Sequence, residues 1–270
     1  MKKNICLLVF ISAAIIAMAL RAYELVSLIE TETGFIISSR YTAAVIVTVS
    51  VALVVFLSSA FVSVSAINGK KNKSFYLMPS VCSLFLGAAA ALEVKENFTG
   101  TPEFLKVLCI VFAVLSAVYF IAFSLRILIH FPLSAYFSII PGIFFVLKAA
   151  CVSIKNAYHT IISDTLFEIA AYCLIMLFFL EFARLANGRA SKTSIKRFSA
   201  FGCAAALLSF TFSVPKILVS PVSSSAAYTV SINEYLLFLT GLYIACEVFS
   251  RVLFAQQQDK KVSIYYTGKH

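Results

Sequence analysis

Long runs of apolar residues dominate this chain, and charged residues fall almost only between them. Residues 41–69, 74–92, 107–125 and 127–147 contain no Asp, Glu, Lys or Arg. A helix needs about 20 mostly apolar residues to cross about 30 Å of hydrocarbon, so these runs can span a membrane. Membrane strands would instead alternate over segments of about ten residues. The pattern therefore predicts membrane-spanning α-helices.

Over the whole chain, the pattern predicts an all-α, polytopic helical membrane bundle with eight transmembrane helices. The spans are expected at about 4–20, 41–65, 75–93, 104–128, 134–153, 164–186, 198–218 and 233–254. They leave short loops and a tail of about sixteen residues, whereas a soluble domain needs at least about 50. We therefore expect a single integral-membrane domain over residues 1–270.

Composition supports this interpretation. The chain is 61% hydrophobic and 13% charged, whereas globular domains are about 45–50% apolar and about 25% charged. Its mean hydropathy is +0.96. These values exclude a soluble globular protein and a disordered one.

Basic residues predict the orientation of the bundle. With a cytoplasmic N-terminus, 15 of the 22 Lys and Arg residues fall on the inner side and 7 on the outer side. Cytoplasmic loops carry such an excess, so both termini are predicted inside a plasma membrane. These charges would contact anionic lipid, and the basic 189–197 loop could dock a cytoplasmic partner. Nucleic-acid binding is not expected, because it needs a basic soluble face.

The N-terminus also fits a secretory signal peptide. Lys2 and Lys3 precede an apolar stretch, and Ala17-Met18-Ala19 resembles a cleavage site. Cleavage would leave seven spans and would not change the orientation of the others. An uncleaved first helix is the preferred interpretation.

Motifs for metal, cofactor or nucleophile chemistry are absent from the sequence. It contains no HExxH, GxSxG or GxxxxGK[ST] motif. The histidines, at 130, 159 and 270, are not expected to share a metal ion. All the cysteines lie in or beside predicted spans and are expected to pack as small apolar residues. Their positions are 6, 82, 109, 151, 173, 203 and 246. No cofactor is expected.

A charge pattern repeats in the second half of the chain. The hairpins 134–186 and 198–254 each carry Lys, Glu, Glu and Arg in that order, with offsets of 66 to 68 residues. The first set is Lys148, Glu168, Glu181 and Arg184, and the second is Lys216, Glu234, Glu247 and Arg251. The near-constant offset predicts a duplicated hairpin in the same orientation.

Helix geometry restricts where these carboxylates can lie. The two glutamates of each helix are 13 residues apart, about 20 Å at 1.5 Å per residue. Because the hydrocarbon is about 30 Å thick, both cannot reach water in an undeformed bilayer. They should face the bundle or a wet cavity, since charge is costly in lipid.

The spacing of the charges suggests partners. Glu181–Arg184 and Glu247–Arg251, at i,i+3 and i,i+4, are expected to form structural ion pairs. The outer acids lack a basic partner on their own helix. Lys148 with Glu168, and Lys216 with Glu234, could pair across helices and line an outward-facing pocket. Alternatively, all four reach interfacial water separately.

Two prolines and one loop also carry predictions. Pro141-Gly142 is expected to kink the fifth span, whereas Pro215 is expected to end the seventh. Residues 21–40 form the longest outer loop, and apolar residues at helical spacing predict a short amphipathic helix within it.

This loop also carries a resemblance to known proteins. Its distinctive positions are Arg21, Tyr23, Glu24, Ile29, Glu30, Thr33, Gly34 and Phe35. The stretch, under a tenth of the chain, resembles a segment of uncharacterised multi-spanning membrane proteins of the clostridial type. The resemblance implies a bacterial cytoplasmic membrane and transfers no activity and no catalytic residue.

Three classes of function compete. Binding or transport of a small polar solute or ion is favoured, with Lys148, Glu168, Lys216 and Glu234 as the substrate-binding residues. The alternative is a non-enzymatic accessory subunit or sensor module acting through a partner. An intramembrane enzyme is the least favoured, because no catalytic constellation is evident.

Overall fold

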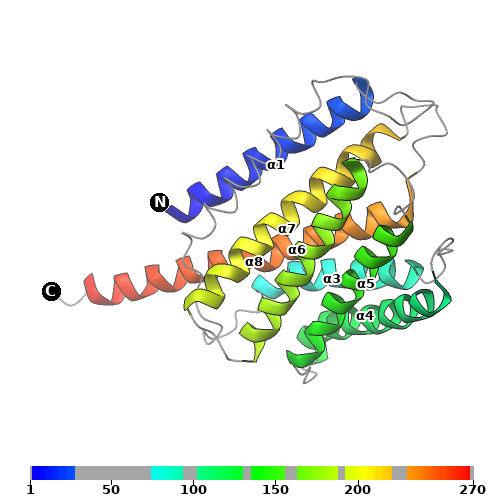
Figure 1. Cartoon of the computed structure of the whole chain (residues 1–270). Coiled ribbons are helices and arrows are strands. Elements are labelled where there is room, and N and C mark those ends of the chain that lie inside the picture. Colours follow the sequence, from blue (N-terminus) through cyan, green and yellow to red (C-terminus); the bar gives the residue numbers. More distant parts are fainter. Residues whose placement is uncertain are drawn as a thin grey trace.

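The chain folds as a helical bundle, which we describe from a computed structural model (Figure 1). The structure describes residues 2–27, 74–93, 102–129, 135–155, 163–187, 192–220 and 230–267. All regular elements in these ranges are helical. They are α1 Lys2–Ser27, α3 Ser74–Glu93, α4 Glu103–Ile129, the 3₁₀ turn η1 Ala135–Ser138, α5 Ile139–Lys155, α6 Ser163–Ala186, α7 Lys192–Val219 and α8 Ile232–Thr267.

Seven of the eight predicted spans coincide with these helices, and the span predicted at 41–65 lies outside the described residues. Within the described part, five helices are long and apolar enough to cross a membrane, namely α4 to α8. The apolar stretches described in α1 and α3 are shorter, Leu8–Tyr23 and Met78–Leu92. The protein is thus consistent with a helical membrane bundle.

Three helices extend beyond the spans predicted for them. α1 continues from the predicted end near 20 to Ser27, α7 begins at Lys192 rather than near 198, and α8 reaches Thr267. The 189–197 segment is therefore partly helical, and much of the expected C-terminal tail is helical too. Apolar runs stop where charged residues begin, but backbone hydrogen bonding continues through them.

The two prolines lie near helix ends. Pro141 is the third residue of α5, directly after η1, and a proline is tolerated in the first turn of a helix. Pro215 was predicted to end its helix, but α7 continues to Val219. Pro215 removes one backbone hydrogen bond, which an N–H at position 215 would donate to the Thr211 carbonyl.

The helices pack around an aromatic centre. α7 contacts α1, α6 and α8, while α3 packs on α4 and α8. Tyr243 of α8 lies against Phe120, Phe123 and Phe179, with ring centroids 5.6, 5.8 and 6.2 Å away. Aromatic side chains bury large apolar areas in such contacts, so this cluster joins α4, α6 and α8.

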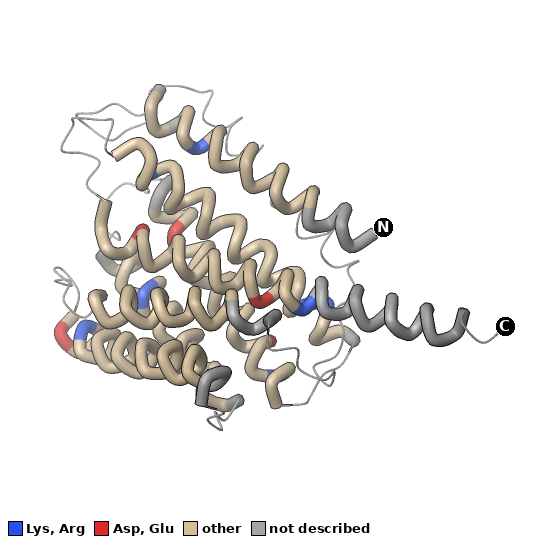
Figure 2. Tube along the Cα trace, turned by 180° about the vertical axis from the view of Figure 1, so that it is seen from behind, with Lys and Arg blue, Asp and Glu red and all other residues tan. Residues whose placement is uncertain are grey.

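The outward surface of α4 is apolar. Exposed side chains follow one face at intervals of three or four residues, at Val107, Val111, Val114, Val118 and Ile121. Charged residues are sparse along the described helices (Figure 2). An exposed apolar stripe of this length would be unfavourable in water, and it fits contact with lipid.

Close helix packing around Gly241 makes that residue sensitive to substitution. A Cβ atom there would lie 2.8 Å from Ser209 Cβ on α7. In Gly241→Ala we therefore expect a loss of about 1–3 kcal/mol, seen as a lower thermal midpoint of the purified protein. The matched control is Gly142→Ala, whose Cβ would meet Phe179 Cβ at an ordinary 3.4 Å. Equal destabilisation of both variants would contradict the close α7–α8 approach.

Candidate functional site

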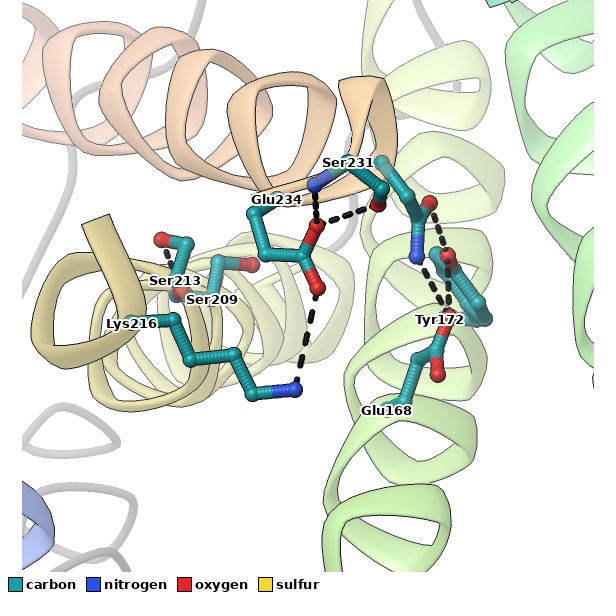
Figure 3. A network of polar contacts seen from close by, with 8 residues as sticks. Glu168, Tyr172, Ser209, Ser213, Lys216, Ser231 and Glu234 are labelled. Carbon is teal, nitrogen blue, oxygen red and sulfur yellow. Dashed lines mark hydrogen bonds and ion pairs between the residues drawn. The ribbon is translucent and has the colours of Figure 1, made fainter. Parts of the chain in front are cut away.

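Polar side chains from α6, α7 and α8 meet near one end of the bundle (Figure 3). We call this group the polar cluster, and it consists of Glu168, Tyr172, Lys216, Ser231, Asn233 and Glu234. These residues come together because α6 and α8 begin at this end of the bundle and α7 ends there.

Glu234 is positioned by the start of α8. Its Oε2 accepts a hydrogen bond of 2.8 Å from the Ser231 backbone N–H and a second bond from the Ser231 hydroxyl. Ser231-x-x-Glu234 is a capping-box sequence, which satisfies N–H groups that have no helical partner. The carboxylate also faces the positive end of the helix dipole. The local sequence therefore sets the position of the Glu234 carboxylate, and its Oε1 points toward α7.

Lys216 meets that carboxylate from α7. Its Nζ lies 3.7 Å from Glu234 Oε1 and 4.0 Å from the ring centroid of Phe212. The ammonium thus lies between a carboxylate and an aromatic face, and both attract a cation. It is also within electrostatic range of Glu168 and Arg21. The cross-helix contact between Lys216 and Glu234 that the sequence predicted is present.

Glu168 accepts hydrogen bonds from side chains that the sequence did not predict as its partners. Its Oε1 lies 2.9 Å from the Tyr172 hydroxyl and accepts a 2.5 Å hydrogen bond from Asn233 Nδ2. The same hydroxyl lies 2.5 Å from Asn233 Oδ1, so its one hydrogen can go to either oxygen. Tyr172 is one turn from Glu168 on α6, whereas Asn233 belongs to α8. The carboxylate therefore ties these two helices together.

The predicted pairing of Lys148 with Glu168 stays a prediction. Lys148 is buried on α5, and the Glu168 carboxylate has Tyr172 and Asn233 as hydrogen-bond partners. A hydroxyl one turn away and an amide from α8 thus contribute to holding Glu168, and neither was predicted from the sequence.

Arg21 was expected in the first outer loop, and its position beside α6 was not predicted. Arg21 lies on α1, is only 2% exposed, and its guanidinium sits 5.3 Å from the ring centroid of Phe167 on α6. The signal was present, because Ala17, Arg21 and Leu25 follow at i and i+4 and all are buried. Helical periodicity continues through the charge where the hydropathy pattern stops.

The other two glutamates lie 13 residues further along α6 and α8. Glu181 Oε1 lies 2.7 Å from Arg184 Nη1, and its Oε2 accepts a 2.6 Å bond from the Ser194 hydroxyl of α7. Glu247 pairs with Arg251 through two contacts of 3.3 Å. Both contacts that the spacing predicted are present, and they fit structural pairing.

Aromatic rings also lie close to the Arg251 guanidinium. Its guanidinium lies 5.3 Å from the ring centroid of Phe182 and 5.5 Å from that of Phe198. Arg251 therefore does not extend away from the protein like a surface residue, but connects α8 to α6 and α7.

Among the described residues, no group of three or more His, Cys, Asp or Glu side chains could hold a metal ion. Comparison of the chain with protein-family models, curated proteins and solved structures finds no match. The resemblance of residues 21–35 to clostridial-type membrane proteins stays a prediction, and the residues after Ser27 lie outside the described part. Function must be argued from the geometry.

The Glu247–Arg251 pair can be tested by removing its cation. Glu247 is fully buried, so Arg251→Met leaves a carboxylate without its partner, at a cost of about 3–5 kcal/mol. We expect a large fall in thermal midpoint, partly restored by adding Glu247→Gln. Arg184→Met is the control, because Arg184 is 50% exposed and Glu181 keeps Ser194. Additive losses in the double variant would mean that the two residues are not energetically coupled.

Proposed function

We propose that the protein binds a small polar solute or ion at the polar cluster, and that binding serves transport across the membrane. One observation carries the proposal: Lys216 and Glu234, two opposite charges, meet across two helices inside the bundle. Their separation is 3.7 Å, against 2.7 Å for Arg184 and Glu181. Charge-assisted bonds are about 2.7–2.9 Å long, so the cross-helix contact is the longer of the two, and a polar solute could interact with both residues.

The burial of these charges favours a function over a purely structural role. Ionisable residues inside membrane bundles are costly and usually mark substrate or ion sites. The Glu181 and Glu247 pairs can be explained by local pairing, but the cluster and the nearby Arg21 together bring two acids and two cations from four helices. These are Arg21 of α1, Glu168 of α6, Lys216 of α7 and Glu234 of α8. Such a balanced set suits a solute with both charges, or an ion that replaces one internal partner.

Further polar groups follow α7 inward from Lys216. Ser209, Ser213 and Lys216 are spaced at i, i+4 and i+7, and so lie on one face of the helix (Figure 3). Ser213 donates to the Ser209 carbonyl, whereas the buried Ser209 hydroxyl has no hydrogen-bond partner in the described part of the chain. An unsatisfied buried hydroxyl is unfavourable, and a polar ligand or water would relieve it.

Binding would affect how helices are joined. Lys216 contacts α8 through Glu234, and Glu168 contacts α8 through Asn233. A ligand that replaces one of these contacts loosens α7 or α6 from α8, which is the kind of differential contact that transport requires. Glu168 and Glu234 are the candidates for coupling to protons. On the distribution of Lys and Arg, we place both termini inside, and the resemblance of residues 21–35 implies a bacterial cytoplasmic membrane.

A second candidate is a non-enzymatic accessory or sensor module. α8 has 36 residues, about 54 Å at 1.5 Å per residue, so part of it must lie outside about 30 Å of hydrocarbon. Near the start of α7, Lys196 and Arg197 are exposed. This end of the bundle is predicted to be cytoplasmic and would offer a basic surface to an acidic partner.

A thermal-shift screen of the purified protein against amino acids, small organic ions and inorganic ions tests the binding proposal. We expect at least one compound to raise the thermal midpoint, and Glu168→Gln and Lys216→Met to abolish its shift. The matched control is Glu103→Gln, which neutralises an exposed carboxylate at the start of α4. A shift that survives both cluster variants would place the ligand elsewhere.

The partner hypothesis predicts a different result. A stoichiometric partner should co-purify from native membranes with the wild-type protein and be lost from Lys196→Glu combined with Arg197→Glu. The cluster variant Glu168→Gln should keep it. Equal recovery with all three proteins would show that the basic start of α7 is not the docking surface.

A further inference from the structure

Two cysteines from neighbouring helices lie in direct contact inside the bundle. The sulfur atoms of Cys109 on α4 and Cys151 on α5 are 3.1 Å apart, although 42 positions separate the two residues in sequence. They are 0% and 4% exposed. A second pair, Cys82 on α3 and Cys246 on α8, is looser at 3.8 Å. Because neither pair forms a sequence motif, the sequence favoured isolated apolar packing for all of these residues.

The two sulfur atoms are close enough to form a disulfide after a small movement. A disulfide has a sulfur–sulfur bond of about 2.05 Å, so Cys109 and Cys151 must approach by about 1 Å. Zinc held by both sulfurs would need bonds of about 2.3 Å in tetrahedral geometry, which requires about 3.8 Å between them. The described residues also supply no third ligand. The geometry of Cys109 and Cys151 therefore favours a bond between sulfurs.

The position of the cysteine pair in the bundle places a positive charge near it. Cys109 lies about two turns from the start of α4, and Cys151 about one turn from the end of α5. Both helices have these ends on the side of the polar cluster, because α5 leads into α6 there. Lys148 lies one turn before Cys151 and within its electrostatic range, so a thiolate on Cys151 would experience a nearby positive charge.

We propose that Cys109 and Cys151 form a reversible disulfide that joins α4 to α5, with a membrane-soluble quinone as the oxidant. Burial in an apolar bundle excludes a bulky protein oxidant, so the oxidant must be a small apolar molecule that can enter between α4 and α5. The two thiols lose two electrons and two protons as the sulfur–sulfur bond forms. The quinone takes up both and becomes the hydroquinone. A dithiol reductant reverses the step by thiol–disulfide exchange.

The bond would stop α4 and α5 from moving relative to each other near Lys148. This provides a redox-dependent constraint on the side of the bundle next to the polar cluster. The proposal stands on the sulfur contact alone and does not depend on solute binding.

The test counts free thiols in the full-length protein. Reduced protein in lipid nanodiscs is incubated with a fully substituted short-chain ubiquinone, denatured, and alkylated with a maleimide of defined mass. We expect the wild-type protein to lose two of its seven thiols, to regain both with dithiothreitol, and to yield a cross-linked peptide containing Cys109 and Cys151. Recovery with dithiothreitol distinguishes the disulfide from a quinone adduct.

Matched variants identify the pair. Cys109→Ser and Cys151→Ala should each lose no thiols, whereas Cys82→Ser and Cys173→Ser should still lose two. Size-exclusion chromatography confirms that each variant is folded, and peptide mapping of the wild-type protein gives the same answer without any substitution. The proposal is overturned if the wild-type protein keeps all its thiols, if the cross-link joins Cys82 to Cys246, or if Cys109→Ser still loses two.

Discussion

The burial of carboxylates in an apolar bundle is the constraint on which the rest of this structure depends. α6 and α8 each carry two glutamates 13 residues apart, about 20 Å, and a hydrocarbon layer of about 30 Å leaves them no common route to water. Each carboxylate therefore needs partners within the protein. These partners are side chains of α6, α7 and α8, so the contacts that stabilise the carboxylates also hold the helices together.

The two ends of the bundle solve this problem differently. Glu181 and Glu247 each have an arginine one turn away on the same helix, and neighbouring helices add a hydroxyl or aromatic rings. Glu168 and Glu234 depend on α8, through an amide in one case and a helix cap in the other. Local pairs are little changed when helices shift, whereas bonds between helices break. The Glu168–Asn233 contact therefore depends on how α6 and α8 are placed relative to each other.

Contacts within one helix could be predicted from sequence, and contacts between helices mostly could not. Spacing of i,i+3 and i,i+4 was enough for Glu181–Arg184 and Glu247–Arg251, because a helix has one geometry. Lys216 and Glu234 were predictable because their hairpin fixes the register. Asn233 with Glu168, or Cys109 with Cys151, depends on which helix faces stand together after packing. The apolar runs predicted where the helices lie but not where they end, since the helical backbone continues past charged residues.

The two hairpins carry the same order of charges but place them in different contacts. Lys148 and Glu168 in the first hairpin correspond to Lys216 and Glu234 in the second, yet the two glutamates have different hydrogen-bond partners. The difference comes from neighbours that the repeat does not share. Position 172 is a tyrosine that reaches Glu168, and α8 offers Asn233 to α6. Glu234 instead accepts hydrogen bonds from Ser231 at the start of its own helix and meets Lys216 of α7. Lys148 also lies within electrostatic range of Cys151, so its charge can influence the thiols of α4 and α5.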